Sequence, residues 1–212
     1  KLEILFMNSF IKNGNTFHLY TYDPIENIPE GVIVKDANEI YPRDKLFLLK
    51  DQYLPFSDIW RYNLLRLKGG IWVDLDMVCV GNMSSLMDKT FVFSSERTIQ
   101  RGAYKMSVPL VPNIGVLKAP IGSEFYIELC DRCEKIQQRG KNTDKIKYMR
   151  ELRKMINKYD YNKYVMKPKV FCPIDWWYAK DLFFSDYSDF REKYGVKPYE
   201  DYNEGVLTIH LW

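Results

Sequence analysis

The chain has 212 residues, of which 46% are hydrophobic and 16% aromatic, and its formal net charge is +3. This length is enough for one large domain or two small ones with a buried core, and the composition is that of a globular protein. So small a net charge gives no indication of a nucleic-acid or anionic-membrane partner. The apolar runs are much shorter than the roughly 20 residues that a membrane span needs.

Apolar residues recur at helical spacing in some segments and alternate in others, which predicts helices and strands in turn. In chain order we expect a helix over 1–13, strands over 17–22 and 32–34, a turn or short helix over 36–40, a helix over 58–68 with Ser57 as its N-cap, strands over 71–80, 91–95 and 115–117, helices over 123–139 and 144–158, and strands over 170–171 and 206–210. The helix over 144–158 is charged and is expected to be mostly solvated. Strands that alternate with helices indicate an α/β domain whose central sheet is mixed and mostly parallel.

The four cysteines, Cys79, Cys130, Cys133 and Cys172, are expected to be buried thiols. Cys130 and Cys133 form a CxxC pair, but neither a second CxxC nor a nearby histidine completes a zinc site. Because the N-terminus also lacks the pattern of a secretory signal, we expect a reducing compartment and a cytoplasmic protein. The sequence begins without Met and stops just after a strand-like run, so we expect it to be a piece of a longer protein.

The segment 69–78, Gly-Gly-Ile-Trp-Val-Asp-Leu-Asp-Met-Val, holds the most informative pattern of the chain. Alternate side chains of a strand point to the same face, so Asp74 and Asp76 are expected to project together with Trp72. Two carboxylates beside so much apolar sequence are costly unless a cation or a hydrogen-bond donor meets them. A divalent metal ion, which prefers oxygen ligands, is therefore the expected partner.

Asp58 and Arg61 lie three residues apart in the helix that precedes this segment, so they share one helical face. Two interpretations are open. An intrahelical ion pair would contribute about 0.3–0.5 kcal/mol to stability. A site for a phosphorylated, polyhydroxylated ligand would use the arginine for bidentate phosphate contacts and the aspartate to accept hydrogen bonds from hydroxyls.

Together, residues 57–76 resemble the signature of the sugar transferases that contain a DXD motif. The family pattern is Ser-Asp-x-x-Arg-x-x-x-Leu, then a Gly-Gly pair, an aromatic residue and Asp-x-Asp, and every one of these positions is matched here. The family includes capsular-polysaccharide transferases, with the clostridial glucosylating toxins as cousins, and a transferase domain of a large virus-encoded glycosylation protein. Further resemblance runs through residues 18–23, 35–38 and 173–177.

The resemblance implies a GT-A-type fold over residues 1–212, with a nucleotide-sugar-binding half at about 1–115 and an acceptor-binding half at about 116–212. It implies an enzyme that moves a hexose from a nucleotide diphosphate sugar, foremost a UDP-sugar, to a hydroxyl of a carbohydrate acceptor, with retention of the anomeric configuration. Mn²⁺ or Mg²⁺ on the DXD acids would neutralise the charge that develops on the departing diphosphate.

Carried onto this chain, the resemblance gives roles to five side chains. Asp76 would bind the metal directly, and Asp74 would contact the metal, directly or through water, as well as the ribose or sugar. Asp58 and Arg61 would contact the hydroxyls and the phosphate of the donor. His210 would be a third metal ligand, since two carboxylates and an imidazole are a reasonable Mn²⁺ set. A satisfied structural imidazole is the alternative for His210.

Five further positions are candidates for ligand contacts. Thr21 and Tyr22 end the first strand, where ligands of open α/β sheets gather, and Tyr22 would either stack on the base or pack on the sheet. Asp36 would contact the uracil or ribose, or simply cap the turn that follows it. Asn113 would contact the sugar. Asp175 precedes a Trp-rich stretch that suits an acceptor, and it would act as the base if the reaction inverted configuration; a core of aromatic residues is the alternative.

Two other functions stay open on the sequence alone. A metal-dependent nucleotidyltransferase would usually carry a Gly-rich loop with Lys or Arg near the N-terminus, which this sequence lacks. A carbohydrate-binding module without catalysis would agree with the five tryptophans and sixteen tyrosines. Metal-dependent hydrolysis of a UDP-sugar would distinguish a transferase from such a module.

Overall fold

The computed structural model describes residues 2–98, 100–101, 106–107, 110–139, 146–176 and 205–212. The α-helices are α1 (Leu2–Lys12), α2 (Leu54–Lys68), α3 (Glu124–Gln138), α4 (Lys147–Lys158) and α5 (Pro168–Phe171), and the 3₁₀ turns are η1 (Ala37–Glu39), η2 (Arg43–Lys45), η3 (Met83–Leu86) and η4 (Tyr161–Tyr164). The strands are β1 (Phe17–Thr21), β2 (Val32–Asp36), β3 (Gly70–Val73), β4 (Met77–Cys79), β5 (Val92–Arg97), β6 (Gln100–Arg101), β7 (Met106–Ser107), β8 (Leu110–Ala119) and β9 (Thr208–His210).

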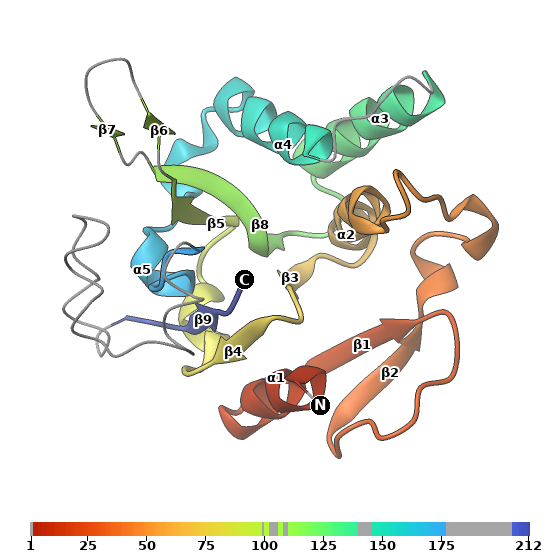
Figure 1. Cartoon of the computed structure of the whole chain (residues 1–212), viewed down its shortest axis with the longest axis vertical. Helices are drawn as coiled ribbons and strands as arrows, with labels where there is room; N and C mark the ends of the chain where they lie inside the picture. The colour runs from red at the N-terminus through yellow and green to blue at the C-terminus, as the bar shows by residue number, and fades with distance from the viewer. Residues whose placement is uncertain (1, 99, 102–105, 108–109, 140–145, 177–204) are drawn as a thin grey trace.

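Strand β8 is the centre of an antiparallel sheet with the order β3-β8-β5 (Figure 1). In its register Leu117 lies opposite Trp72 of β3 on one side and opposite Phe93 of β5 on the other. Strands β1 and β2 form a separate parallel pair, while β4 pairs with β9 and β6 with β7 in antiparallel fashion. Figure 1 shows the β1–β2 pair set apart from the central sheet, with α1 beside it.

Neighbouring residues of β5 and β8 enter two different cores, because successive side chains of a strand face opposite sides of the sheet. Phe93 and Leu117 belong to a cluster with residues of α2, α3 and α4, whereas Val92 and Val116 belong to a second cluster with residues of α1, β4 and α5. Figure 1 shows α3 and α4 above β8, and α1 and β4 below it. The central sheet therefore lies between two apolar layers, and the turn that joins β3 to β4 passes from one to the other.

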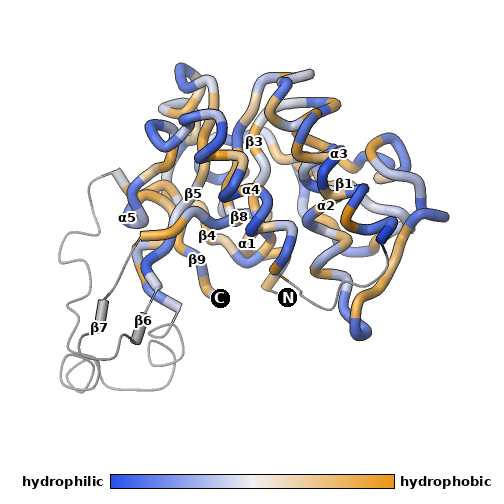
Figure 2. Tube along the Cα trace, turned by 90° about the horizontal axis from the view of Figure 1, so that it is seen from above, coloured by the Kyte–Doolittle hydropathy of each residue, from blue (hydrophilic) through white to orange (hydrophobic). Residues whose placement is uncertain are grey.

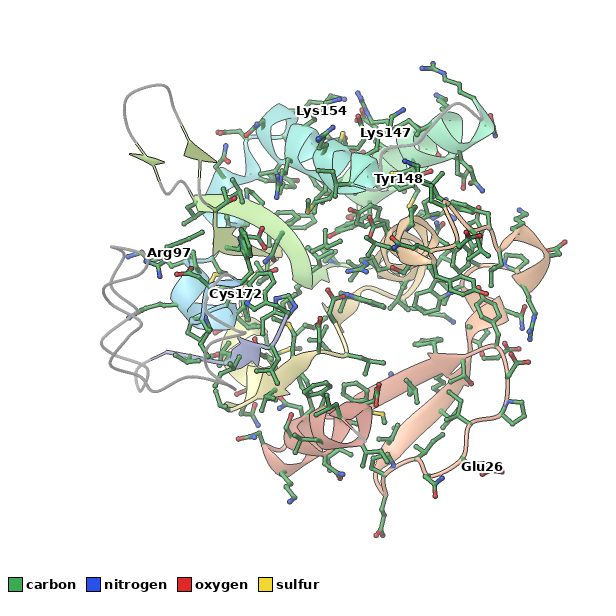
Figure 3. All side chains as sticks on the ribbon, in the orientation of Figure 1. Glu26, Arg97, Lys147, Tyr148, Lys154 and Cys172 are labelled. Atoms are coloured by element: carbon green, nitrogen blue, oxygen red, sulfur yellow. The ribbon has the colours of Figure 1, made fainter. Side chains whose placement is uncertain are left out.

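Helix α4 is amphipathic, although the sequence predicted a mostly solvated helix. Tyr148, Leu152, Met155 and Ile156 are buried, and their spacing of four, three and one residues is that of a single helical face. Lys154 lies on the outer side of the helix (Figure 3). The change between polar and apolar residues along the helices can be followed in Figure 2.

The predicted α/β class is confirmed, but the expectation of mostly parallel strands does not hold. Among the described strands only β1 and β2 pair in parallel. A parallel neighbour needs a crossover of about a dozen residues or more, whereas the chain passes from β5 to β8 through the antiparallel pair β6–β7.

Three predicted elements also differ from the structure. The strand expected over 71–80 is interrupted, because Asp74, Leu75 and Asp76 form a turn between β3 and β4. The strand expected over 170–171 is the end of α5, which begins at Pro168, a residue that suits a first helical position. Helix α2 begins at Leu54, so Ser57 lies inside it and is not its N-cap.

The four cysteines are buried thiols, as predicted. Burial raises the pKa of Cys130 and of Cys172 to about 12, so both thiols are neutral at physiological pH. Across the described residues, each helix is too short or too polar to cross a lipid bilayer.

Gly69, which ends α2 and aims β3 at the turn, is expected to tolerate no side chain. Its φ is +64°, and a Cβ there would lie 2.7 Å from the backbone nitrogen of Ile121 and 3.1 Å from the carbonyl oxygen of Ala119. Gly70 also has a positive φ, but a Cβ there would meet nothing within 4 Å. We expect Gly69→Ala to lower the free energy of unfolding by about 3 kcal/mol, and Gly70→Ala by only about 1–2 kcal/mol, the cost of a left-handed backbone. Urea unfolding measures both losses, and equal losses would contradict the steric argument.

Candidate active site

The turn over residues 74–76, called the DLD turn here, is held by main-chain hydrogen bonds at both ends. The N–H of Asp74 donates to the carbonyl oxygen of Gly115 in β8 at 2.9 Å, and the N–H of Leu211 donates to that of Asp76 at 3.0 Å. The central sheet therefore fixes one end of the turn and the segment that follows β9 fixes the other.

Arg61 in α2 is buried, and its guanidinium joins the helix to the DLD turn. Nη1 donates to Asp74 Oδ1 at 2.7 Å and to the carbonyl oxygen of Ile114 at 3.1 Å. Nη2 donates to Ser57 Oγ at 3.1 Å, and Asp58 Oδ1 lies 3.5 Å from it. The predicted pairing of Asp58 with Arg61 therefore exists, but the same guanidinium also binds the first acid of the turn.

Trp72 is the second donor to Asp74. Its indole Nε1–H donates to Asp74 Oδ1 at 2.8 Å, and the Arg61 guanidinium carbon lies 4.8 Å from the centre of its ring. The sequence placed Trp72 on the same face as Asp74 but gave it no role. The residue type could have indicated this role. The indole N–H of a tryptophan is a hydrogen-bond donor, and two residues before an aspartate on the same face it can reach the carboxylate. The contact between Ser57 and Arg61 was likewise missed, although their four-residue spacing on a helix predicts it.

A single guanidinium serves two carboxylates here, the buried Asp58 and the half-buried Asp74. Burial raises the pKa of Asp58 to about 7, and the attraction of Arg61 offsets this only in part. Burial also raises the pKa of Asp74, against the opposing effects of Arg61 and of the hydrogen bond from Trp72. Burial works to lower the pKa of Arg61, but the two carboxylates outweigh it and raise that pKa. Arg61 therefore stays charged, and Asp58 holds its proton up to about neutral pH.

The raised pKa of Asp58 predicts a pH-dependent loss of stability. A carboxyl whose pKa is about 7 in the folded state and near 3.8 in the unfolded state favours folding when protonated, and this contribution fades as the pH rises from about 4 to 7. Relative to wild type, Asp58→Asn is therefore expected to gain on the order of 1–3 kcal/mol in unfolding free energy between pH 5 and pH 8. Urea unfolding at the two pH values measures the difference. Asp131→Asn, at an exposed position of α3, should follow wild type, and a parallel course of Asp58→Asn would contradict the prediction.

Asp76 has a different partner from Asp74. His210 Nε2 lies 3.1 Å from Asp76 Oδ2, because the pairing of β4 with β9 places His210 opposite Met77. Burial works to raise the pKa of Asp76, but the hydrogen bond and the charge of His210 outweigh it, so this pKa lies below its usual range. The sequence expectation that Asp76 and His210 lie together is met, and Asp76 is an anion at physiological pH.

The chemistry of this pair suits a divalent cation. Asp76 Oδ1 is buried and makes no hydrogen bond within the described residues, and a carboxylate oxygen and an imidazole nitrogen are ligands that Mn²⁺ accepts. Because His210 Nε2 faces Asp76 Oδ2, a cation held by both would take the place of the contact between them. In the described part of the chain, no three side chains of His, Cys, Asp or Glu gather closely enough to hold an ion by themselves. The third expected ligand, Asp74, turns its Oδ1 to Arg61 and Trp72. The pair therefore fits a cation whose remaining ligands come from a bound molecule.

A groove of about 1320 Å³ runs between β1 and β3 and reaches the turn. Thr21, the last residue of β1, and Tyr22, which follows it, line the groove together with Ser57 and Trp72. Asp36 ends β2 directly opposite Thr21. The ends of β1 and β2 thus lie on the same side of the molecule as the turn, as expected for an open α/β sheet.

Tyr22 and Asp36 are both engaged by neighbouring residues. The Tyr22 hydroxyl donates to the carbonyl oxygen of Tyr41 at 2.7 Å, and its ring centre lies 6.4 Å from that of Phe56. Asp36 Oδ1 accepts from the backbone N–H of Asn38 at 2.8 Å and thereby caps η1. The alternative roles that the sequence left open, sheet packing for Tyr22 and turn capping for Asp36, are therefore both present.

Asn113 and Asp175 are buried in polar contacts of their own. The Asn113 side-chain amide donates to Glu96 Oε2 at 3.0 Å and accepts from the Ser94 hydroxyl. The guanidinium of Arg97 binds both oxygens of Asp175, and Figure 3 shows Arg97 near α5. Burial raises the pKa of Asp175, although Arg97 opposes this. These contacts join Asn113 and Asp175 to β5 and not to the DLD turn.

Residues 7–93, from α1 into β5, match the protein family described as "Glycosyltransferase sugar-binding region containing DXD motif". This part of the chain is therefore similar to the sugar-binding region of glycosyltransferases that contain a DXD motif. A protein of Acanthamoeba polyphaga mimivirus, named as an uncharacterized glycosyltransferase, is 28% identical over 95 residues, which are 45% of this chain and 32% of that protein. Asp74-Leu75-Asp76 is an Asp-x-Asp sequence within this matched region.

Among solved structures the chain is similar to "PaToxG Glycosyltransferase", with a TM-score of 0.51 and 17% identity over 75% of this chain and 64% of that one. This likeness confirms the predicted GT-A-like α/β fold. The chain spans about a third of the viral relative and less than two thirds of the PaToxG chain.

Proposed function

We propose that this chain is a metal-dependent glycosyltransferase that moves a hexose from a UDP-sugar to a hydroxyl of a carbohydrate acceptor, with retention of configuration. The observation that carries the proposal is the division of the DLD turn into two charged halves. Asp76 meets His210, while Asp74 meets the guanidinium of Arg61. A cation-binding half beside a fixed positive charge suits a sugar diphosphate, and the family match over residues 7–93 supports the same activity.

The two halves of the turn would meet different parts of the donor. Asp76 and His210, assisted by Asp74, would hold Mn²⁺ or Mg²⁺, which when bound neutralises the charge that develops on the departing diphosphate. Arg61 would add a positive charge that is already oriented by its protein partners. Asp58 Oδ1 is buried without a hydrogen bond among the described residues, so a sugar hydroxyl would satisfy an acceptor that otherwise stays unpaired.

The other candidate residues would bind the parts of the donor and acceptor that lie away from the metal and Arg61. Thr21, Tyr22 and Asp36, at the ends of β1 and β2, would face the nucleoside. Asn113 would contact the sugar, and Asp175 would lie on the acceptor side. Retention needs no protein base in this proposal, because an oxygen of the departing phosphate takes the proton of the acceptor hydroxyl on the same face of the sugar from which the diphosphate leaves.

A thermal-shift screen of UDP-sugars with and without Mn²⁺ tests the proposal, since a ligand that binds only the folded state raises apparent stability. We expect at least one UDP-sugar to raise the melting temperature in the presence of Mn²⁺ and to be hydrolysed slowly under the same conditions. The matched guanosine diphosphate sugar is the control for the nucleotide. Absence of any metal-dependent shift, together with metal-independent glycan binding, would contradict a transferase and favour a carbohydrate-binding module.

A further inference from the structure

Asp74 receives its hydrogen bonds unevenly. The indole Nε1–H of Trp72 and the Nη1 of Arg61 both donate to Oδ1, at 2.8 and 2.7 Å. Within the described residues, no side chain donates a hydrogen bond to Oδ2 of the same carboxylate. Since an ionised carboxylate can accept at both oxygens, Oδ2 is the oxygen through which Asp74 can serve a bound ligand.

Arg61 on its own would favour another arrangement. A guanidinium tends to bind a carboxylate through two parallel N–H···O bonds that occupy both oxygens. Here only Nη1 reaches Asp74, whereas Nη2 and Nε donate to the hydroxyl and the carbonyl oxygen of Ser57. Arg61 therefore contacts Asp74 through one nitrogen, Nη1, and one oxygen, Oδ1.

Trp72 is placed to support this contact through a single oxygen of Asp74. Its ring lies 4.8 Å from the guanidinium carbon of Arg61, a distance at which the face of an indole attracts a cation. Its N–H donates to the same oxygen, Oδ1, as Arg61 Nη1, so two donors from different elements hold Asp74 by one oxygen. Its backbone is fixed in β3 opposite Leu117 of β8, so the indole is anchored to the central sheet and not to α2.

We propose that Trp72 is a positioning residue, which together with Arg61 holds Asp74 by Oδ1 and so leaves Oδ2 turned to the metal-bound donor. This inference rests on the proposed function, because it assumes a nucleotide sugar and a divalent cation at the turn. It gives the aromatic residue before the DXD motif a task that depends on the indole N–H, which a phenyl ring of similar shape cannot perform.

The test compares two Trp→Phe substitutions in neighbouring rings. Trp72→Phe keeps a ring beside Arg61 and removes the N–H. Trp60→Phe is the matched control, because the ring of Trp60 lies 5.9 Å from that of Trp72 and its buried N–H makes no hydrogen bond within the described residues. Calorimetric titration of the intact chain with Mn²⁺, in the presence of the UDP-sugar found by the screen, is expected to show an apparent Kd raised about 10-fold in Trp72→Phe and unchanged in Trp60→Phe.

A double-mutant cycle then shows whether Trp72 acts through Asp74. In an Asp74→Ala background the further change Trp72→Phe is expected to leave the apparent Kd of Mn²⁺ unaltered, because the hydrogen bond is already lost. Equal weakening in the two Trp→Phe variants, or an undiminished effect in the Asp74→Ala background, would overturn the inference. Wild-type affinity in Trp72→Phe would overturn it while leaving the proposed function intact. A wild-type chain that binds no UDP-sugar with Mn²⁺ would overturn both.

Discussion

Asp76→Asn is expected to lower metal-dependent sugar transfer by about 1,000-fold, which corresponds to about 4 kcal/mol of transition-state stabilisation, while the chain keeps its fold. Asp76 carries the oxygen that meets His210 and, in the proposed function, the cation. The amide of asparagine has nearly the same shape but no charge, so it weakens the hold on the cation. The rate of hexose release from the UDP-sugar at saturating Mn²⁺ measures the loss.

Stability is expected to change little in this variant, because the side chain of Asp76 is 47% exposed. A circular-dichroism melt checks that the variant is folded. Asp131→Asn, at an exposed position of α3, is the control for removal of one carboxylate and should keep the wild-type rate. Wild-type turnover by a folded Asp76→Asn variant would refute the assignment of this acid to the reaction.

Arg61→Met is expected to lower the free energy of unfolding by about 3–5 kcal/mol, the usual result when one partner of a buried ion pair is removed. The methionine fills much of the same space, but Asp58 and Asp74 lose the cation that they share. The half-buried Asp74 would then stay without a counter-charge, and so would the ionised fraction of Asp58, which is costly unless both take up protons. Urea unfolding at neutral pH measures the loss.

Two further variants separate charge from packing. Arg61→Met combined with Asp58→Asn and Asp74→Asn is expected to regain most of the lost stability, because the buried charges are removed together. Arg132→Met, which removes a surface partner of Glu128, should cost less than about 1 kcal/mol. If Arg61→Met cost no more than Arg132→Met, Arg61 would not be the centre of a buried charge network.

Local sequence patterns were sufficient for the half of the site that lies on consecutive elements. Helix α2, its end at Gly69 and the face shared by Asp58 and Arg61 follow from spacing within a few turns of one helix. The approach of Asp76 to His210 followed only from the family resemblance, because nothing in the local sequence shows that β9 pairs with β4.

The partners of the predicted residues could not be found in the same way. The turn at Asp74 breaks a strand that the alternation of apolar residues favours, and the break is stabilised by hydrogen bonds from α2, β8 and the segment after β9. Asp175 is bound by Arg97, a residue 78 positions earlier. Such long-range contacts depend on how the elements pack against one another. The spacing of residues along one segment does not determine this packing, so local patterns cannot predict the contacts.

The pairing of β4 with β9 has a consequence for the order in which the protein folds. Thr208 packs on Met77, 131 positions away, so the Asp76–His210 half of the turn is closed by contacts of very large sequence separation. Contacts of this kind form late, because the entropy of closing a long loop must be overcome before they contribute. During synthesis the Arg61–Asp74 half can assemble while the chain is still growing, whereas the Asp76–His210 half has to wait for the last strand. A nascent or truncated chain without residues 208–210 would thus carry its arginine network complete and its proposed cation site unfinished.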